Sequence, residues 1–198
     1  MIVATDFDGV IFDFKNMLES GLKNKYNLDI SNCWKDGYYI KVKDTPDEKL
    51  AEMILRTIKE DTIKGSPIKD SLECLKKLSD FFSCPIHIIT ARKEDLANEA
   101  EKWLEMHTKE LGLKYVFSYY DTTKQKRSQF FHKDTRYYID DQTVNILDIL
   151  SDTNNIRYCF LLKQIYNEND LIPEEFIKKI HVADNWSEIH HYLYYILK

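Results

Sequence analysis

The sequence of 198 residues predicts an α/β fold, namely a doubly wound, Rossmann-like parallel sheet with a small helical cap inserted after its first strand. From residue 66 onward, short apolar runs typical of buried strands alternate with helical patterns. The stretch 13–65 interrupts this order, because it is helical in pattern and contains no convincing core strand. We therefore expect residues 1–12 and 67–198 to form the core and residues 13–66 to form the cap.

The elements follow in order along the chain. A strand is expected over residues 2–7. Within the helical region, Thr-Pro-Asp-Glu at 45–48 reads as a capping box with proline in the first helical position, and Leu50, Ile54 and Ile58 then recur on one helix face. Later helices are expected at 72–78, 96–107 and 185–196, and later strands at 86–89, 115–117, 137–139 and 158–161. Such alternation of strands and helices predicts a parallel sheet with helices on both faces.

Composition narrows the class of protein. Hydrophobic residues make up 43% of the chain and aromatic residues 13%, as in folded globular proteins. The formal net charge of −5 disfavours a binder of long nucleic acid, and no apolar run is long enough to span a membrane. The four cysteines form no CxxC pair, and the first residues lack the order of a signal peptide. We expect free thiols, a cytoplasmic location and no membrane partner.

The first strand ends in Asp6-Phe7-Asp8-Gly9. Alternation along an extended chain places Asp6 and Asp8 on one side and turns Phe7 into the core. Two adjacent carboxylates repel each other unless a cation lies between them, and Mg²⁺ prefers oxygen ligands. Gly9 lets the backbone turn closely and leaves amides free to face an anion. The alternative is an ordinary surface turn with two acids.

Further polar residues follow two later strands. Thr90 and Ala91 come after residues 86–89 and just before a helical pattern that includes Arg92, so a hydroxyl and helix N-terminal amides could bind a phosphate. His87, inside this strand, is expected to be a hydrogen-bonded core histidine. The pair Asp140-Asp141 follows the strand at 137–139. Ligands of open α/β sheets bind at the carboxyl ends of strands, which would bring these groups together.

These motifs resemble those of the haloacid dehalogenase superfamily of phosphohydrolases. DFDGV at 6–10 resembles the first motif, IIT at 88–90 the second, Lys126 the third and Asp140-Asp141 the fourth. Lys124 is a second possibility for the third motif, and the spacing to Asp140 favours Lys126. DFDGVIFDF at 6–14, ITAR at 89–92 and Trp103-Leu104 resemble the 5'(3')-deoxyribonucleotidase branch.

The resemblance implies a mechanism and a role for each residue. Asp6 would attack phosphorus to give an aspartyl-phosphate, and Asp8 would act as general acid and base. Thr90 and Lys126 would neutralise the phosphoryl oxygens, with Gly9, Ala91 and Arg92 beside them. Asp6, Asp140 and the backbone carbonyl of Asp8 would hold Mg²⁺, and Asp141 would orient the other ligands or bind the ion through water. The cap would close over this site and select the substrate.

The substrate is less constrained by the sequence. Trp34, Tyr38 and Tyr39 in the cap could stack on a nucleobase, although a small lobe also needs aromatic side chains for its own core. The first hypothesis is a 5'-nucleotidase acting on (deoxy)nucleoside monophosphates. The alternatives are a 3'-phosphatase of nucleic-acid ends and a non-catalytic binding module. A basic run could bind a polynucleotide backbone or form a charged helix face; it comprises Lys124, Lys126, Arg127, Lys133 and Arg136.

Overall fold

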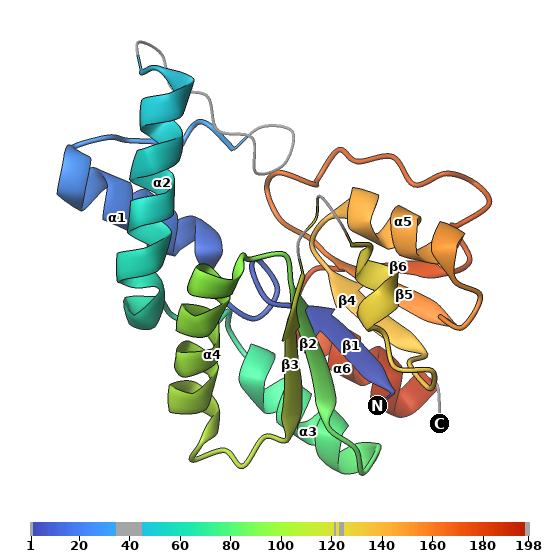
Figure 1. Ribbon diagram of the computed structural model, residues 1–198. Coiled ribbons are helices and arrows are strands. Elements are labelled where there is room, and N and C mark those ends of the chain that lie inside the picture. The colour runs from blue at the N-terminus through green and yellow to red at the C-terminus, as the bar shows by residue number, and fades with distance from the viewer. Residues whose placement is uncertain (1, 35–44, 121, 123–124, 197–198) are drawn as a thin grey trace.

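The computed structural model describes residues 2–34, 45–120, 122 and 125–196 of the chain. They contain a six-stranded sheet in the order β3-β2-β1-β4-β5-β6, in which all neighbouring strands are parallel. The strands are β1 (Val3–Asp6), β2 (Ile86–Thr90), β3 (Tyr115–Tyr119), β4 (Tyr137–Asp140), β5 (Tyr158–Leu162) and β6 (Ile180–Ala183). The chain builds outward from β1 to β3 and then returns to the other side of β1 for β4 to β6, so the predicted doubly wound sheet is confirmed (Figure 1).

Helices cover both faces of the sheet (Figure 1). They are α1 (Phe14–Tyr26), α2 (Asp47–Asp61), α3 (Ser71–Phe81), α4 (Glu94–Thr108), α5 (Thr143–Asp152) and α6 (Trp186–His191), with short turns η1 (Thr62–Lys64), η2 (Arg127–Phe130) and η3 (Tyr192–Ile196). Along β1, Val3 packs in a cluster with residues of α3, α4 and α6, whereas Ala4 packs in a second cluster with residues of α5. Burial on both faces is complete along β1, β2 and β4, which explains the mainly apolar runs in the sequence there.

Between β1 and α3 the chain leaves the sheet and forms α1 and α2, which pack against each other beside α4 (Figure 1). The amide of Asp13 donates to the carbonyl of Ser66 (3.0 Å), which joins the segment entering this pair to the segment leaving it. The predicted capping box is not present, because the N-cap lies one residue later than expected. Helix α2 begins at Asp47, and Pro46 takes the N-cap position without a side-chain hydrogen bond. Its first-turn acids still complement the helix dipole.

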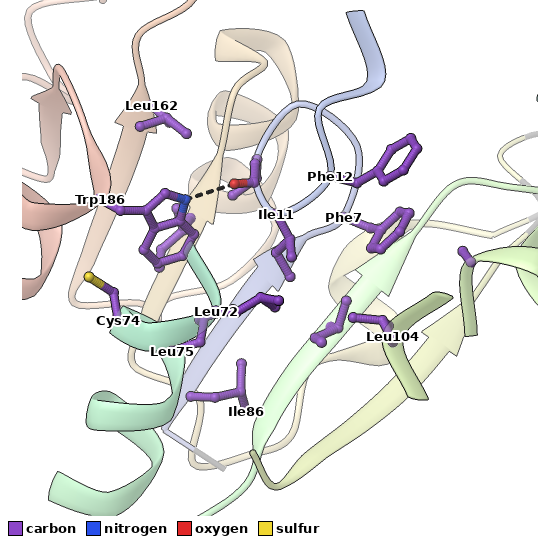
Figure 2. Packing of buried hydrophobic residues seen from close by; sticks show 14 of the residues in the cluster. Phe7, Ile11, Phe12, Leu72, Cys74, Leu75, Ile86, Leu104, Leu162 and Trp186 are labelled. Carbon is purple, nitrogen blue, oxygen red and sulfur yellow. Dashed lines mark hydrogen bonds between the residues drawn. The ribbon is translucent and has the colours of Figure 1, made fainter. Parts of the chain in front are cut away.

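Two buried tryptophans hold the backbone where the sheet meets the α1–α2 pair. The indole of Trp186 donates to the carbonyl of Val10 (2.7 Å), as Figure 2 shows, and the indole of Trp103 donates to the carbonyl of Gly65 (2.7 Å). A Cβ on Gly65 would lie 2.3 Å from the Phe12 ring, so this close approach needs glycine. The loop after β1 is thus fixed from both sides.

Two elements were not among those predicted, namely α5 and the edge strand β6. The cysteines Cys33, Cys74, Cys84 and Cys159 are free thiols, as expected. Among the helices of the described residues, none combines the length and the apolar character that crossing a bilayer requires.

His87 lies in β2 with 4% of its surface exposed, and its Nε2 pairs with the hydroxyl of Ser118 (2.9 Å), which confirms the predicted core histidine. Burial lowers the pKa of His87 to about 4. The unfolded chain therefore binds a proton at a higher pH than the folded chain does, and stability falls as the pH drops from about 6.5 toward 4.

His87→Gln keeps a hydrogen-bonding group for Ser118 but cannot titrate. Wild type is expected to lose about 2 kcal/mol more unfolding free energy than the variant between pH 7 and pH 4.5. Urea unfolding of both proteins at the two pH values measures the difference. Equal losses would show that His87 is protonated as readily in the folded state as in the unfolded chain.

Candidate active site

The carboxyl ends of β1 and β4 bring three acids together. One carboxylate oxygen from each of Asp6, Asp140 and Asp141 can be chosen so that all lie within 4.8 Å of one another, and all three residues are buried. Burial raises the pKa of Asp6 well above its ordinary value; the nearby acids raise it further and Arg127 opposes them. Carboxylates this close need positive charge to stay ionised together.

Arg127 supplies part of that charge. Its Nη1 lies 3.1 Å from Oδ1 of Asp6 and also contacts Oδ2 of Asp140, while its Nε donates to the Tyr120 hydroxyl (2.8 Å). Tyr138 on β4 contacts both Arg127 and Asp140 through its hydroxyl. A buried guanidinium therefore bridges the acids that end β1 and β4.

The predicted third-motif lysine lies elsewhere. The ammonium of Lys126 pairs with Asp152 on α5 at 2.8 Å, and its side chain is 68% exposed. The structure thus places Lys126 away from Asp6, and among the described residues the cationic side chain that contacts Asp6 is that of its neighbour, Arg127. Lys124, the other possibility, lies outside the described residues.

Asp8 is held by Arg92. The guanidinium donates from Nε to one carboxylate oxygen of Asp8 (2.8 Å) and from Nη2 to the other (2.7 Å), and its Nη1 donates to the hydroxyl of Thr62 in η1 (2.9 Å). Three aromatic rings lie within 6.0 Å of its central carbon, namely Phe7, Phe12 and Phe14. Arg92 was predicted to bind phosphate. In this arrangement it orients Asp8 and ties it to the turn that follows α2.

The predicted anion-binding backbone is at the same edge of the sheet. Gly9 has a φ of 72°, as the tight turn required, and its carbonyl accepts from Gln164 (2.9 Å). Thr90 ends β2, where its buried hydroxyl accepts from the amide of Arg92 (3.2 Å), and Ala91 is exposed. These groups lie where the prediction placed them, at the ends of β1 and β2.

Asp140 and Asp141 accept hydrogen bonds that fix their carboxylates. Oδ1 of Asp140 accepts from the amide of Gln142 (2.8 Å) and from the side chain of Asn145 (3.2 Å). Oδ2 of Asp141 contacts the hydroxyl of Tyr166. Both carboxylates are therefore oriented before any ligand arrives.

Trp34 does not have the exposed face that base stacking needs. It is 4% exposed, belongs to the main core cluster, and packs against Tyr166 with ring centroids 6.2 Å apart. The alternative that this aromatic side chain builds core is thus favoured. Tyr38 and Tyr39 lie outside the described residues.

The donor set fits a hard divalent cation. The site contains the carboxylates of Asp6, Asp8, Asp140 and Asp141 against the guanidiniums of Arg92 and Arg127, a formal excess of two negative charges (four against two). Carboxylate oxygens are the ligands that Mg²⁺ prefers. Arg127 already occupies a position between Asp6 and Asp140 that suits positive charge.

Neither a protein-family model nor a curated protein sequence matches this chain. Several solved structures match its fold. A candidate phosphatase from Clostridium difficile is 17% identical, with a TM-score of 0.63 over 95% of this chain and 96% of that one. A HAD family hydrolase from Deinococcus radiodurans R1, with bound phosphate and sodium, is 14% identical with a TM-score of 0.63 over 97% and 94%. A candidate HAD hydrolase from Bacillus subtilis, bound to magnesium, is 14% identical with a TM-score of 0.59 over 97% of both chains.

This α/β fold matches that of the solved HAD hydrolases. At these identities the likeness concerns the fold alone, and the chemistry must be argued from the residues of this chain. On this sheet, the acids that the sequence singled out lie at or just after the ends of two adjacent strands, β1 and β4.

Sequence reasoning missed three contributions to the site. Arg127 appeared only as one member of a basic run, although its position beside Lys126 was a signal. The clamp of Arg92 on Asp8 had no signal in the local sequence, because these residues are 84 positions apart. Tyr166 was not singled out, and it reaches Asp141 from the segment after β5.

Proposed function

We propose that this protein is a Mg²⁺-dependent phosphomonoester hydrolase that works through an aspartyl-phosphate. The observation that carries the proposal is the buried Asp6 carboxylate at the end of β1, with the Arg127 guanidinium on one of its oxygens and Asp140 and Asp141 beside it. A nucleophile among fixed charges at the carboxyl edge of the sheet suits attack on an anionic phosphoryl group.

In the first step, a carboxylate oxygen of Asp6 forms a bond to phosphorus and the bond from phosphorus to the ester oxygen breaks. The leaving alkoxide takes a proton from Asp8. In the second step, Asp8 removes a proton from water, which attacks phosphorus and releases inorganic phosphate while Asp6 is regenerated. Arg92 fixes the direction of the Asp8 carboxylate through both oxygens.

Charge must be balanced throughout the transfer. Arg127 would donate hydrogen bonds to phosphoryl oxygens, together with the hydroxyl of Thr90 and the backbone near Gly9. Asp6, Asp140 and Asp141, with the carbonyl of Asp8, would hold Mg²⁺, which supplies neutralisation and alignment of the phosphoryl group when bound. One solved relative in fold carries phosphate and another magnesium, which supports this choice of ligands.

For the substrate, we propose a (deoxy)nucleoside 5'-monophosphate, with residues 13–66 acting as the cap that selects it. The support is the resemblance of the ITAR and DFDGV motifs to the deoxyribonucleotidase branch. Because Trp34 is buried, any base stacking in the cap falls to other aromatic side chains, such as Tyr38 and Tyr39. A reducing compartment such as the cytoplasm suits the four free thiols.

A phosphate-release screen tests both levels of the proposal. Purified protein is offered nucleoside monophosphates, sugar phosphates and 3'-phosphorylated oligonucleotides, with Mg²⁺ and with EDTA. We expect hydrolysis only with Mg²⁺ and the highest kcat/KM for a nucleoside monophosphate. Preference for the oligonucleotide, weakening steeply with salt, would favour a phosphatase of nucleic-acid ends. Absence of turnover on every substrate would favour a binding module.

A further inference from the structure

The segment that follows β5 is attached to the active-site loops by side-chain hydrogen bonds. Gln164 donates to the carbonyl of Gly9 (2.9 Å), and Asn167 donates to the carbonyls of Asp141 (2.7 Å) and Leu162 (2.9 Å). The backbone amide of Gln164 donates in turn to Asn167 Oδ1 (2.8 Å). The segment therefore supports both the loop after β1 and the acid pair after β4.

Tyr166, in the middle of this segment, contacts two parts of the site at once. Its hydroxyl donates to Oδ2 of Asp141, a carboxylate with no exposed surface. Its ring packs against Trp34, with centroids 6.2 Å apart and planes inclined by 36°. Trp34 follows α1 within the predicted cap, and Tyr166 itself is only 6% exposed. One buried side chain thus connects the cap region to a predicted metal ligand.

We infer that Tyr166 is a positioning residue for the cation site. Its hydroxyl orients Asp141, and its ring links this hydrogen bond to the cap through the contact with Trp34. This inference rests on the proposed function. A carboxylate that accepts a fixed hydrogen bond on one oxygen presents the other in a defined direction, and loss of such a partner typically costs about ten- to a hundredfold in metal affinity.

The contact with Trp34 adds a second consequence. If Trp34 moves with the cap, the Tyr166 ring loses packing and its hydroxyl is less firmly held on Asp141. The position of the cap and the affinity for the cation are then linked, and the linkage passes through this one hydroxyl.

Two variants separate the two contacts. Tyr166→Phe keeps the ring on Trp34 and removes only the hydroxyl. Trp34→Leu keeps the hydroxyl and removes the aromatic packing. Tyr192→Phe is the matched control, because Tyr192 packs near Tyr158 (ring centroids 5.9 Å apart), at the opposite end of β5.

The readout is binding of Mn²⁺, as a probe for the divalent site, and of Mg²⁺, measured by calorimetric titration without substrate. Tyr166→Phe is expected to weaken binding of both ions about ten- to a hundredfold. Trp34→Leu is expected to weaken binding about two- to fivefold, and this effect should vanish when Tyr166 is already Phe. Tyr192→Phe should bind as wild type does. Thermal melts in EDTA verify that each variant is folded.

The outcomes distinguish this inference from the proposed function. If wild type binds metal and hydrolyses phosphomonoesters but Tyr166→Phe binds metal equally well, the positioning role is wrong and the function stands. If wild type binds neither Mn²⁺ nor Mg²⁺, both the positioning role of Tyr166 and the proposed function are wrong. Should Tyr166→Phe fail to fold, Trp34→Leu decides: unchanged metal affinity there would overturn the link to the cap and the inference with it.

Discussion

Asp6→Asn is expected to abolish phosphomonoester hydrolysis, lowering kcat by at least about 10⁴-fold, as removal of a covalent nucleophile typically does. The amide oxygen of asparagine is a poor nucleophile toward phosphorus, and the variant also loses one negative charge for holding Mg²⁺. Release of phosphate from a nucleoside monophosphate and from an aryl phosphate measures the loss. Trapping of an acid-stable, hydroxylamine-sensitive phosphoenzyme in wild type alone would identify the intermediate.

The same variant should not unfold. Burial and the neighbouring acids raise the pKa of Asp6, so its charged form opposes folding, and a neutral amide relieves that cost. Asp13→Asn is the matched control because it makes the same chemical change at the N-cap of α1, where asparagine also caps well. Turnover that survives in Asp6→Asn, with Asp13→Asn at wild-type rate, would rule out the phosphoaspartate route.

The sequence predicted the parts of the site that are local. Asp6, Thr90 and the pair Asp140-Asp141 each follow an apolar run, and the rule that parallel strands end at one edge brings them together. The positive φ of Gly9 and the burial of His87 were likewise local features. For these residues, a short stretch of chain decides both the backbone and the direction of the side chain.

The parts that could not be predicted depend on contacts between distant segments. Arg127, rather than Lys126, lies beside the acids because two tyrosine hydroxyls accept hydrogen bonds from its guanidinium. These tyrosines are Tyr120, just after β3, and Tyr138 on β4. Trp34 packs against Tyr166, which lies 132 positions further along the chain (166 − 34 = 132). Strand β6 is only four residues long, and only its first and last residues are buried, so its pattern is too short to stand out.

Arg127→Ala is expected to lower kcat about 10²- to 10³-fold, which is typical when one fixed donor to the reacting oxyanion is removed. Lys126→Ala is expected to retain nearly wild-type kinetics, because Lys126 is exposed and paired with Asp152. Arg127→Lys should fall between them, since an ammonium keeps the charge beside Asp6 and Asp140 but cannot also make the hydrogen bond that Nε of Arg127 donates to Tyr120. Steady-state kinetics at saturating Mg²⁺ compare the three variants.

Thermal stability with and without Mg²⁺ tests why Arg127→Ala loses turnover. Among the described residues, Arg127 is the cationic side chain that contacts both Asp6 and Asp140. Its removal should therefore lower the stability of the metal-free protein more than that of the metal-bound protein. The rise in Tm on adding Mg²⁺ should therefore be larger in Arg127→Ala than in wild type. Greater loss of turnover in Lys126→Ala than in Arg127→Ala would mean that Lys126 leaves Asp152 when substrate binds, and that Arg127 only balances the buried acids.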